Sequence, residues 1–398
     1  TPCGTLFPYT TLFRSSGGHP WIGVCCQGEG ADIWWPCKDH PSDEPDSMAL
    51  HFTVPDLLQC VSNGSLRAVT EHAGGMRTYH WFVSYPVNNY CITLNIGNFI
   101  HIRKEDAELE FPLDFWILED SLCRAEDLLA KVADYVKFMQ EFFGPFPFQN
   151  DKFGVVHTDY LGMEHQTLIS YGSDFTNNAF GFDELMLHEL SHEWWGNLVT
   201  AADWKDLWLH EGFAMYTEAL YAEYSGGTDA LTSYMQQFPT RNLCPVAPFE
   251  SRTIGEIYSN DVYYKGAWIL HTLRYLIGDQ TFFDLLKTWA YPDVDADARL
   301  ACRLVSSDDF ISIVESVTGK DLDWFFDLYL RQPELPVLEY YIQGDSLFLS
   351  WQTASGVPFP MPLQVRITGI DHRVEMRSGQ GSIWVGHSEF IIDPDQWV

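Results

Sequence analysis

Basic side chains and long apolar runs are both scarce in this sequence of 398 residues. Only 23 lysines and arginines stand against 55 aspartates and glutamates, which gives a formal net charge of -32. A surface of this sign repels phosphate backbones, so the composition argues against nucleic-acid binding. No run of eighteen or more apolar residues occurs, so the sequence predicts no membrane span.

Paired cysteines and a recognisable leader are also missing. The nine cysteines are scattered, odd in number and without any C-x-x-C pair, so they suit buried apolar positions better than a disulfide framework or a thiolate zinc site. The chain begins at Thr1 without a methionine or a basic leader, and residues 1–15 show no persuasive periodicity. We expect these residues to be a foreign lead-in that replaces the true start. The compartment therefore stays open, and a soluble periplasmic or extracellular location is favoured over the cytoplasm.

The periodicity of apolar residues changes twice along the chain. Short apolar runs such as 49–54 and 90–96 predict strands up to about residue 120. Helical spacing then dominates, and alternation returns after Pro333 and Pro336. We expect a multidomain α+β chain with a partial N-terminal β domain (16–120), a mainly helical domain (121–333) and a small β-sandwich domain (334–398). Helices are expected over 125–143, 208–224, 228–237, 262–277, 279–289, 307–318 and 322–330.

One string carries the clearest chemical signal, L-H-E-L-S-H-E-W-W-G-N over 187–197. His188 and His192 stand four residues apart, so both imidazoles project from one face of a helix. Glu189 lies between them, where it could act on a metal-held water, and Glu211 in W-L-H-E-G offers a third ligand. Two imidazoles, a carboxylate and an open position indicate a catalytic zinc site. The simpler alternative is a helix whose histidines only satisfy hydrogen bonds in the core.

Two further polar residues have equally plausible structural roles. Glu218 lies seven residues after Glu211 on the same helix face, where it could orient a ligand or simply be a carboxylate at the surface or at the rim of the core. Asn197 could support the site or merely cap the end of the zinc helix.

The combined motifs resemble those of one family of zinc peptidases. H-E-x-x-H-x-W-x-G-N from His188 to Asn197, followed by W-L-x-E-G-F-A over 208–214, is similar to the signature of the aminopeptidase N / leukotriene hydrolase family of gluzincins. The resemblance implies a saddle-like N-terminal β domain, a thermolysin-like catalytic domain and one Zn²⁺ per chain. It also implies a truncated bacterial member, in which the first strands of the β domain and the large C-terminal helical domain of many relatives are absent.

The same resemblance suggests how a peptide amine would be bound. The string L-G-M-E-H over 161–165 is similar to the family motif G-x-M-E-N, so Glu164 would bind the free α-amine of the substrate beside Gly162 and Met163. A fixed carboxylate in a partly desolvated pocket suits an ammonium group. Leu161 and His165 depart from the motif. Gln27, nine residues ahead of a P-C-x-D-x-P string, would help hold the amine.

A second motif concerns the oxyanion. Tyr263-Tyr264-Lys265-Gly266 matches the family string Y-x-K-G, so the resemblance assigns the hydroxyl that stabilises the developing oxyanion to Tyr263. Tyr264 is the runner-up, because a pattern alone cannot separate two adjacent tyrosines. On a helix the two side chains point about 100° apart.

We expect from these motifs a zinc-dependent aminopeptidase acting on peptides with a free N-terminus, with Glu189 as general base. The alternatives are an epoxide hydrolase of the same family, a non-catalytic peptide-binding member, and a thermolysin-like endopeptidase, which Glu164 disfavours. The preferred N-terminal residue and the oligomeric state cannot be predicted from the sequence.

Overall fold

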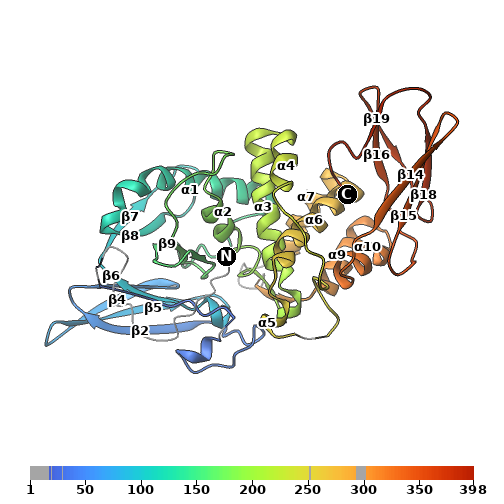
Figure 1. Ribbon diagram of the computed structural model, residues 1–398. Helices are drawn as coiled ribbons and strands as arrows, with labels where there is room; N and C mark the ends of the chain where they lie inside the picture. Colours follow the sequence, from blue (N-terminus) through green and yellow to red (C-terminus); the bar gives the residue numbers. More distant parts are fainter. Residues whose placement is uncertain (1–17, 19, 29, 251, 293–301) are drawn as a thin grey trace. The chain divides into compact units, whose positions relative to one another are not determined.

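The computed structural model describes residues 18, 20–28, 30–250, 252–292 and 302–398 (Figure 1). The expected lead-in, 1–15, lies outside the described residues. The chain divides into two compact units, one formed by the residues up to Asp203 with Ala290–Val305, the other by Trp204–Trp289 with Ser306–Val398. N-terminal sheets, helices in the middle of the chain and C-terminal strands confirm the predicted α+β fold class.

The first unit begins with two antiparallel three-stranded sheets. Their strand orders are β1-β6-β3 and β2-β5-β4. The strands are β1 (Trp21–Gly23), β2 (Met48–Pro55), β3 (Gln59–Ser62), β4 (Ser65–His72), β5 (Met76–Val83) and β6 (Leu94–Gly97). The expected strand over 90–96 is wrong in its first half. There the side chain of Asn88 accepts a hydrogen bond from Tyr90 N and begins the short helix η2 (Asn89–Cys91) instead.

A mixed five-stranded sheet follows, in the order β10-β11-β9-β8-β7. Its strands are β7 (Phe99–Lys104), β8 (Leu113–Leu118), β9 (Phe153–His157), β10 (Gly162–Met163) and β11 (Ile169–Tyr171). Strands β8, β9 and β11 run parallel, while β10 pairs antiparallel with β11 at the edge. Helix α1 (Leu122–Phe143) contacts β8, and α2 (Glu184–Ser191) contacts β10 and β11. The metal-motif helix is therefore positioned next to the edge strand.

The remaining elements of the first unit are short. They are η1 (Ala31–Ile33), η3 (Glu119–Ser121) and the parallel pair β12 (Val199–Ala201) and β13 (Arg303–Val305).

The second unit is built around two long helices, α3 (Trp208–Gly226) and α6 (Asn260–Ile277), which run side by side (Figure 1). They cross where Gly212 faces Gly266. A Cβ at Gly212 would lie 2.8 Å from the Cα of Gly266, so only glycine allows the two backbones to come this close. The other helical elements of this unit are η4 (Trp204–Asp206), α4 (Thr228–Met235), α5 (Ile254–Ile257), α7 (Asp279–Ala290), α9 (Ser307–Thr318) and α10 (Asp323–Arg331).

The chain continues into a β-sandwich, as the sequence predicts. Two three-stranded sheets, β14-β15-β18 and β17-β16-β19, contribute to one apolar core that includes Leu349 and Val365. The strands are β14 (Val337–Gln343), β15 (Ser346–Gln352), β16 (Leu363–Ile367), β17 (Ile370–Val374), β18 (Gln380–Trp384) and β19 (Phe390–Ile392).

Two expectations from composition can also be compared with the structure. Among the helices that the structure describes, none is both long and apolar enough to cross a membrane. Every cysteine in the described part of the chain is a free thiol, but only Cys26, Cys60 and Cys91 are buried.

Candidate active site

Helix α2 carries the first part of the metal motif. Asp183 caps its N-terminus by accepting a hydrogen bond from Met186 N at 3.0 Å, and the hydroxyl of Tyr171 donates to the same carboxyl group at 2.5 Å. The helix ends at Ser191, earlier than the motif suggests. His192 nevertheless keeps a right-handed helical backbone as the C-cap, so it still projects on the same side as His188.

His188 and His192 form a pair suited to a metal ion. Their ring centroids lie 4.8 Å apart, and their ligand nitrogens come within 4.8 Å of each other. Nδ1 of the buried His192 lies 2.7 Å from the carbonyl oxygen of Trp195. Because a carbonyl only accepts, Nδ1 must carry the proton, which makes Nε2 the nitrogen that can act as a metal ligand. Metal-binding histidines in proteins are held in this way, so the donor set fits zinc.

Two carboxylates from different segments meet at this pair. Oxygen atoms of Glu164 and Glu189 lie within 4.8 Å of each other and of a nitrogen of His192. Both glutamates are buried. Strand β10 passes directly beside them, since a Cβ at Gly162 would lie 2.4 Å from Oε1 of Glu189. The predicted general base and the predicted amine-binding residue therefore belong to one cluster.

The side chain of Glu164 is held by two donors. Nε2 of Gln27 donates to its Oε1 at 2.8 Å, and the hydroxyl of Tyr90 donates to the same atom at 3.0 Å. These two hydrogen bonds fix the position of the carboxyl group. Gln27 had only a weak basis in the sequence, and Tyr90 was missed, because it lies 74 residues from Glu164 in a stretch expected to be a strand.

Residues around Glu164 have structural roles. Met163 is buried at the sheet edge. His165, which departs from the family motif, is fully buried, and burial lowers its pKa to about 3, so the ring is neutral. Its Nδ1 lies 2.9 Å from Oγ of Ser170. The side chain of Asn197 does not cap α2. Its Nδ2 donates to the backbone oxygen of Glu164 at 3.0 Å.

The predicted carboxylates of α3 lie in the second unit. Glu211 and Glu218 are both buried. Glu218 accepts a hydrogen bond from the hydroxyl of Tyr234 at 2.5 Å, so it is not a surface carboxylate. Gly212, immediately after Glu211, makes the close contact between α3 and α6.

The two candidate tyrosines of helix α6 have different neighbours. The hydroxyl of Tyr263 is hydrogen-bonded to that of Tyr258. The ring of Tyr264 is instead stacked on Phe238, with centroids 5.3 Å apart and planes within 4°. Lys265 donates to two carbonyl oxygens just after α10, those of Gln332 and Pro333, each at 3.0 Å. The lysine of the Y-x-K-G string therefore connects α6 to the segment that follows α10.

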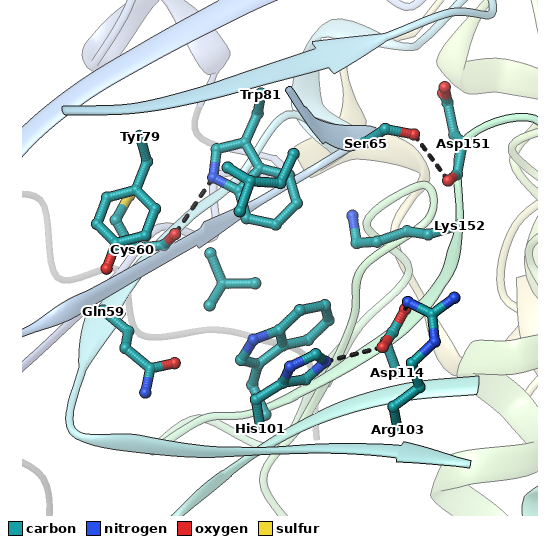
Figure 2. Close-up of a pocket in the computed structure, with 13 residues that line it drawn as sticks. Gln59, Cys60, Ser65, Tyr79, Trp81, His101, Arg103, Asp114, Asp151 and Lys152 are labelled. Atoms are coloured by element: carbon teal, nitrogen blue, oxygen red, sulfur yellow. Dashed lines mark hydrogen bonds and ion pairs between the residues drawn. The ribbon is translucent and has the colours of Figure 1, made fainter. Parts of the chain in front are cut away.

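A cavity of about 430 Å³ in the first unit contains none of these residues (Figure 2). It is lined by strands β3, β4, β5, β7 and β8, and Lys152 points into it beside Trp81. Nζ of Lys152 donates to the carbonyl oxygens of Ser62 and Gly64, at 2.8 and 2.6 Å. This buried amino group therefore holds the turn between β3 and β4.

Comparison with known proteins gives a consistent result. The profile of the peptidase family M1 domain matches residues 129–329, about half of the chain. Aminopeptidase B of Mus musculus is 27% identical over 347 residues, which cover 79% of this chain and 50% of that protein. Aminopeptidase N of Haemonchus contortus is 24% identical over 366 residues, with coverages of 83% and 37%. The chain thus spans between about a third and a half of the curated relatives it matches.

Solved structures show the same likeness. An M1 zinc metallopeptidase from Deinococcus radiodurans superposes with a TM-score of 0.68 at 25% identity, covering 80% of this chain and 71% of that one. Aminopeptidase A of Legionella pneumophila, solved in complex with aspartic acid, has a TM-score of 0.77 over 96% of this chain and 46% of its own. At 19% identity the latter shows the fold alone.

Proposed function

Because this chain belongs to peptidase family M1, we propose that it is a zinc-dependent aminopeptidase that hydrolyses the first peptide bond of peptides with a free N-terminus. One observation carries the proposal: Glu164, held by two donors, lies within 4.8 Å of Glu189 and His192. An amine-binding carboxylate this close to a metal-binding histidine suits a peptide whose first residue lies beside the metal site.

His188 and His192 would hold one Zn²⁺ per chain, with Glu211 as the third ligand. The proton on Nδ1 of His192 supports the first part of this assignment, and the match to the W-L-x-E-G-F-A motif supports the second. Bound zinc supplies a water of lowered pKa and polarises the scissile carbonyl. Glu218, hydrogen-bonded to Tyr234, would support Glu211 from the same helix.

Glu189 would accept the proton of the attacking water and deliver it to the leaving amine. Its position beside Gly162 and close to His192 supports this role, because a general base must lie within reach of the water that it deprotonates. Tyr263 would donate its hydroxyl to the developing oxyanion. The stacking of Tyr264 on Phe238 leaves Tyr263 as the better candidate.

Glu164 and Gln27 would bind the substrate ammonium, and Tyr90 would hold the carboxylate from the other side. Strand β10 pairs only with β11 within the described sheet, so Gly162 and Met163 lie at an edge where an extended peptide could add a strand. A peptide that adds to β10 with its ammonium group on Glu164 would have its first peptide bond next to Glu189.

The test is a panel of aminoacyl fluorogenic substrates, measured with and without a chelator and after zinc is restored. We expect hydrolysis of free-amine substrates that stops with the chelator and returns with zinc. A blocked internal peptide and a lipid epoxide serve as comparison substrates. Cleavage of the blocked peptide at a similar rate would show an endopeptidase, and turnover of the epoxide alone would show the other activity of the family.

A further inference from the structure

The turn that follows Glu164 is buried and strained. His165, Gln166 and Thr167 are fully buried, and Thr167 has a φ of 62°, in the left-handed region. A β-branched residue rarely adopts this conformation, because Cβ crowds the following carbonyl at a cost of roughly 1–2 kcal/mol. Surrounding contacts must therefore hold the turn in place.

Two side chains just after the metal histidines supply such contacts. The carboxyl group of Glu193 accepts hydrogen bonds from Thr167 N at 2.8 Å and from Nδ2 of Asn197 at 3.3 Å. The same Nδ2 of Asn197 donates to the backbone oxygen of Glu164. Glu193 is thus connected to both ends of the turn, directly at Thr167 and through Asn197 at Glu164.

Glu193 is itself completely buried and follows His192 in the chain. A displacement of its carboxyl group would move the turn relative to the metal-binding histidine. We propose that Glu193 is a positioning residue, which fixes the distance between the amine-binding carboxylate of Glu164 and the metal site. This inference rests on the proposed function, and it adds a residue that neither the zinc signature nor the amine motif specifies.

A purely structural role is the alternative, because other contacts also hold the turn. Nδ2 of Asn63 donates to the oxygen of Gln166 at 2.6 Å, and Gly64 N donates to Oγ1 of Thr167 at 2.8 Å. These contacts come from the β3–β4 turn and do not involve the metal helix. If they alone set the turn, loss of Glu193 would lower stability without a selective effect on amine binding.

The experiment compares two inhibitors, leucine hydroxamate and its analogue without the amine, 4-methylpentanoyl hydroxamate. The inhibition constant of the analogue divided by that of leucine hydroxamate reports amine binding, because both compounds present the same metal-binding group. In Glu193→Ala we expect leucine hydroxamate to weaken roughly tenfold while the analogue changes little, as for loss of one buried hydrogen bond. KM for free-amine substrates should rise more than kcat falls.

Glu193→Gln provides a graded comparison. Its amide oxygen can still accept from Thr167 N, but its NH₂ faces the donor of Asn197, so we expect an intermediate ratio. The control is Asp393→Asn, since Asp393 also accepts two backbone N–H groups, from Trp397 at 2.8 Å and Val398 at 3.1 Å, in the C-terminal region. Asp393→Asn should lower stability and leave the ratio at the wild-type value.

Each outcome is decisive. A wild-type ratio near one means that Glu164 binds no amine, and the proposed function fails together with this inference. A large wild-type ratio that persists in Glu193→Ala overturns the inference alone. If Glu193→Ala does not fold, Glu193→Gln decides, and a wild-type ratio in that variant overturns the proposal.

Discussion

The crossing of α3 and α6 gives the sharpest prediction about the catalytic geometry. Replacing Gly212 by alanine would place a methyl group 2.8 Å from Cα of Gly266, whereas ordinary contact begins near 3.4 Å. The helices must therefore separate by about 0.6 Å or more at this point. Glu211 and Tyr263 lie on the two helices, one and three residues from the crossing, so their spacing should change directly.

The magnitude follows from two opposing effects. Overpacking costs about 1–3 kcal/mol, and alanine recovers up to about 1 kcal/mol of helix propensity, so Gly212→Ala should lose about 1–2 kcal/mol of stability. A misplacement of about 1 Å costs up to 10²-fold in rate, so we expect kcat/KM to fall by about ten- to a hundredfold. Gly255→Ala in α5 is the matched control, because its methyl group would meet nothing within 4 Å.

Urea unfolding and hydrolysis of an aminoacyl substrate would be measured on both variants and the wild type. Gly255→Ala should keep full activity and be as stable as the wild type or slightly more stable. The reasoning would be refuted if Gly212→Ala matched the wild type in both activity and stability, since the helices would then not depend on the close contact.

Three further predictions concern single side chains. Glu189→Gln should retain zinc by metal analysis but lose about 10²- to 10⁴-fold in kcat, the usual contribution of a general base, and loss of zinc would argue against the assignment. Tyr263→Phe should lower kcat more than tenfold while Tyr264→Phe changes it little, and the reverse result would make Tyr264 the oxyanion donor. Burial lowers the pKa of Lys152 to about 7 from its usual 10.5, so between these values the unfolded chain binds more protons and stability rises with pH. This rise, about 3–4 kcal/mol between pH 7 and pH 10, should be missing from Lys152→Met in urea unfolding over that range, and equal slopes in the two proteins would contradict it.

Much of the fold could be predicted because local signals agree with the final structure. The helix over 307–318 was predicted to the residue: Ser306 and Asp309 form a capping box at its start, and Gly319 ends it with a left-handed backbone. The strand expected over 90–96 does not form in its first half, because contacts with residues distant in the sequence determine the backbone there. Asn63, for example, binds the oxygen of Cys91 and the N–H of Thr93.

The candidate site shows the same division between local and distant information. His188 and His192 follow from spacing along one helix, and Glu164 follows from a motif. Tyr90 and Glu193 could not be predicted, because a tyrosine or glutamate has many possible partners and only the folded chain selects one. The left-handed conformation of Thr167 was equally unpredictable, since threonine gives no signal for it.

The central claim is that Glu164 makes the metal site act from the amino end of a peptide. The most direct test is the ratio of kcat/KM for a free-amine peptide to that for its N-acetylated form, in the wild type and in Glu164→Ala. We predict a wild-type ratio above roughly 100, and a fall in the variant that comes from loss of the free-amine rate, since a buried carboxylate contributes several kcal/mol to binding an ammonium. A ratio that is the same in both proteins would contradict the account.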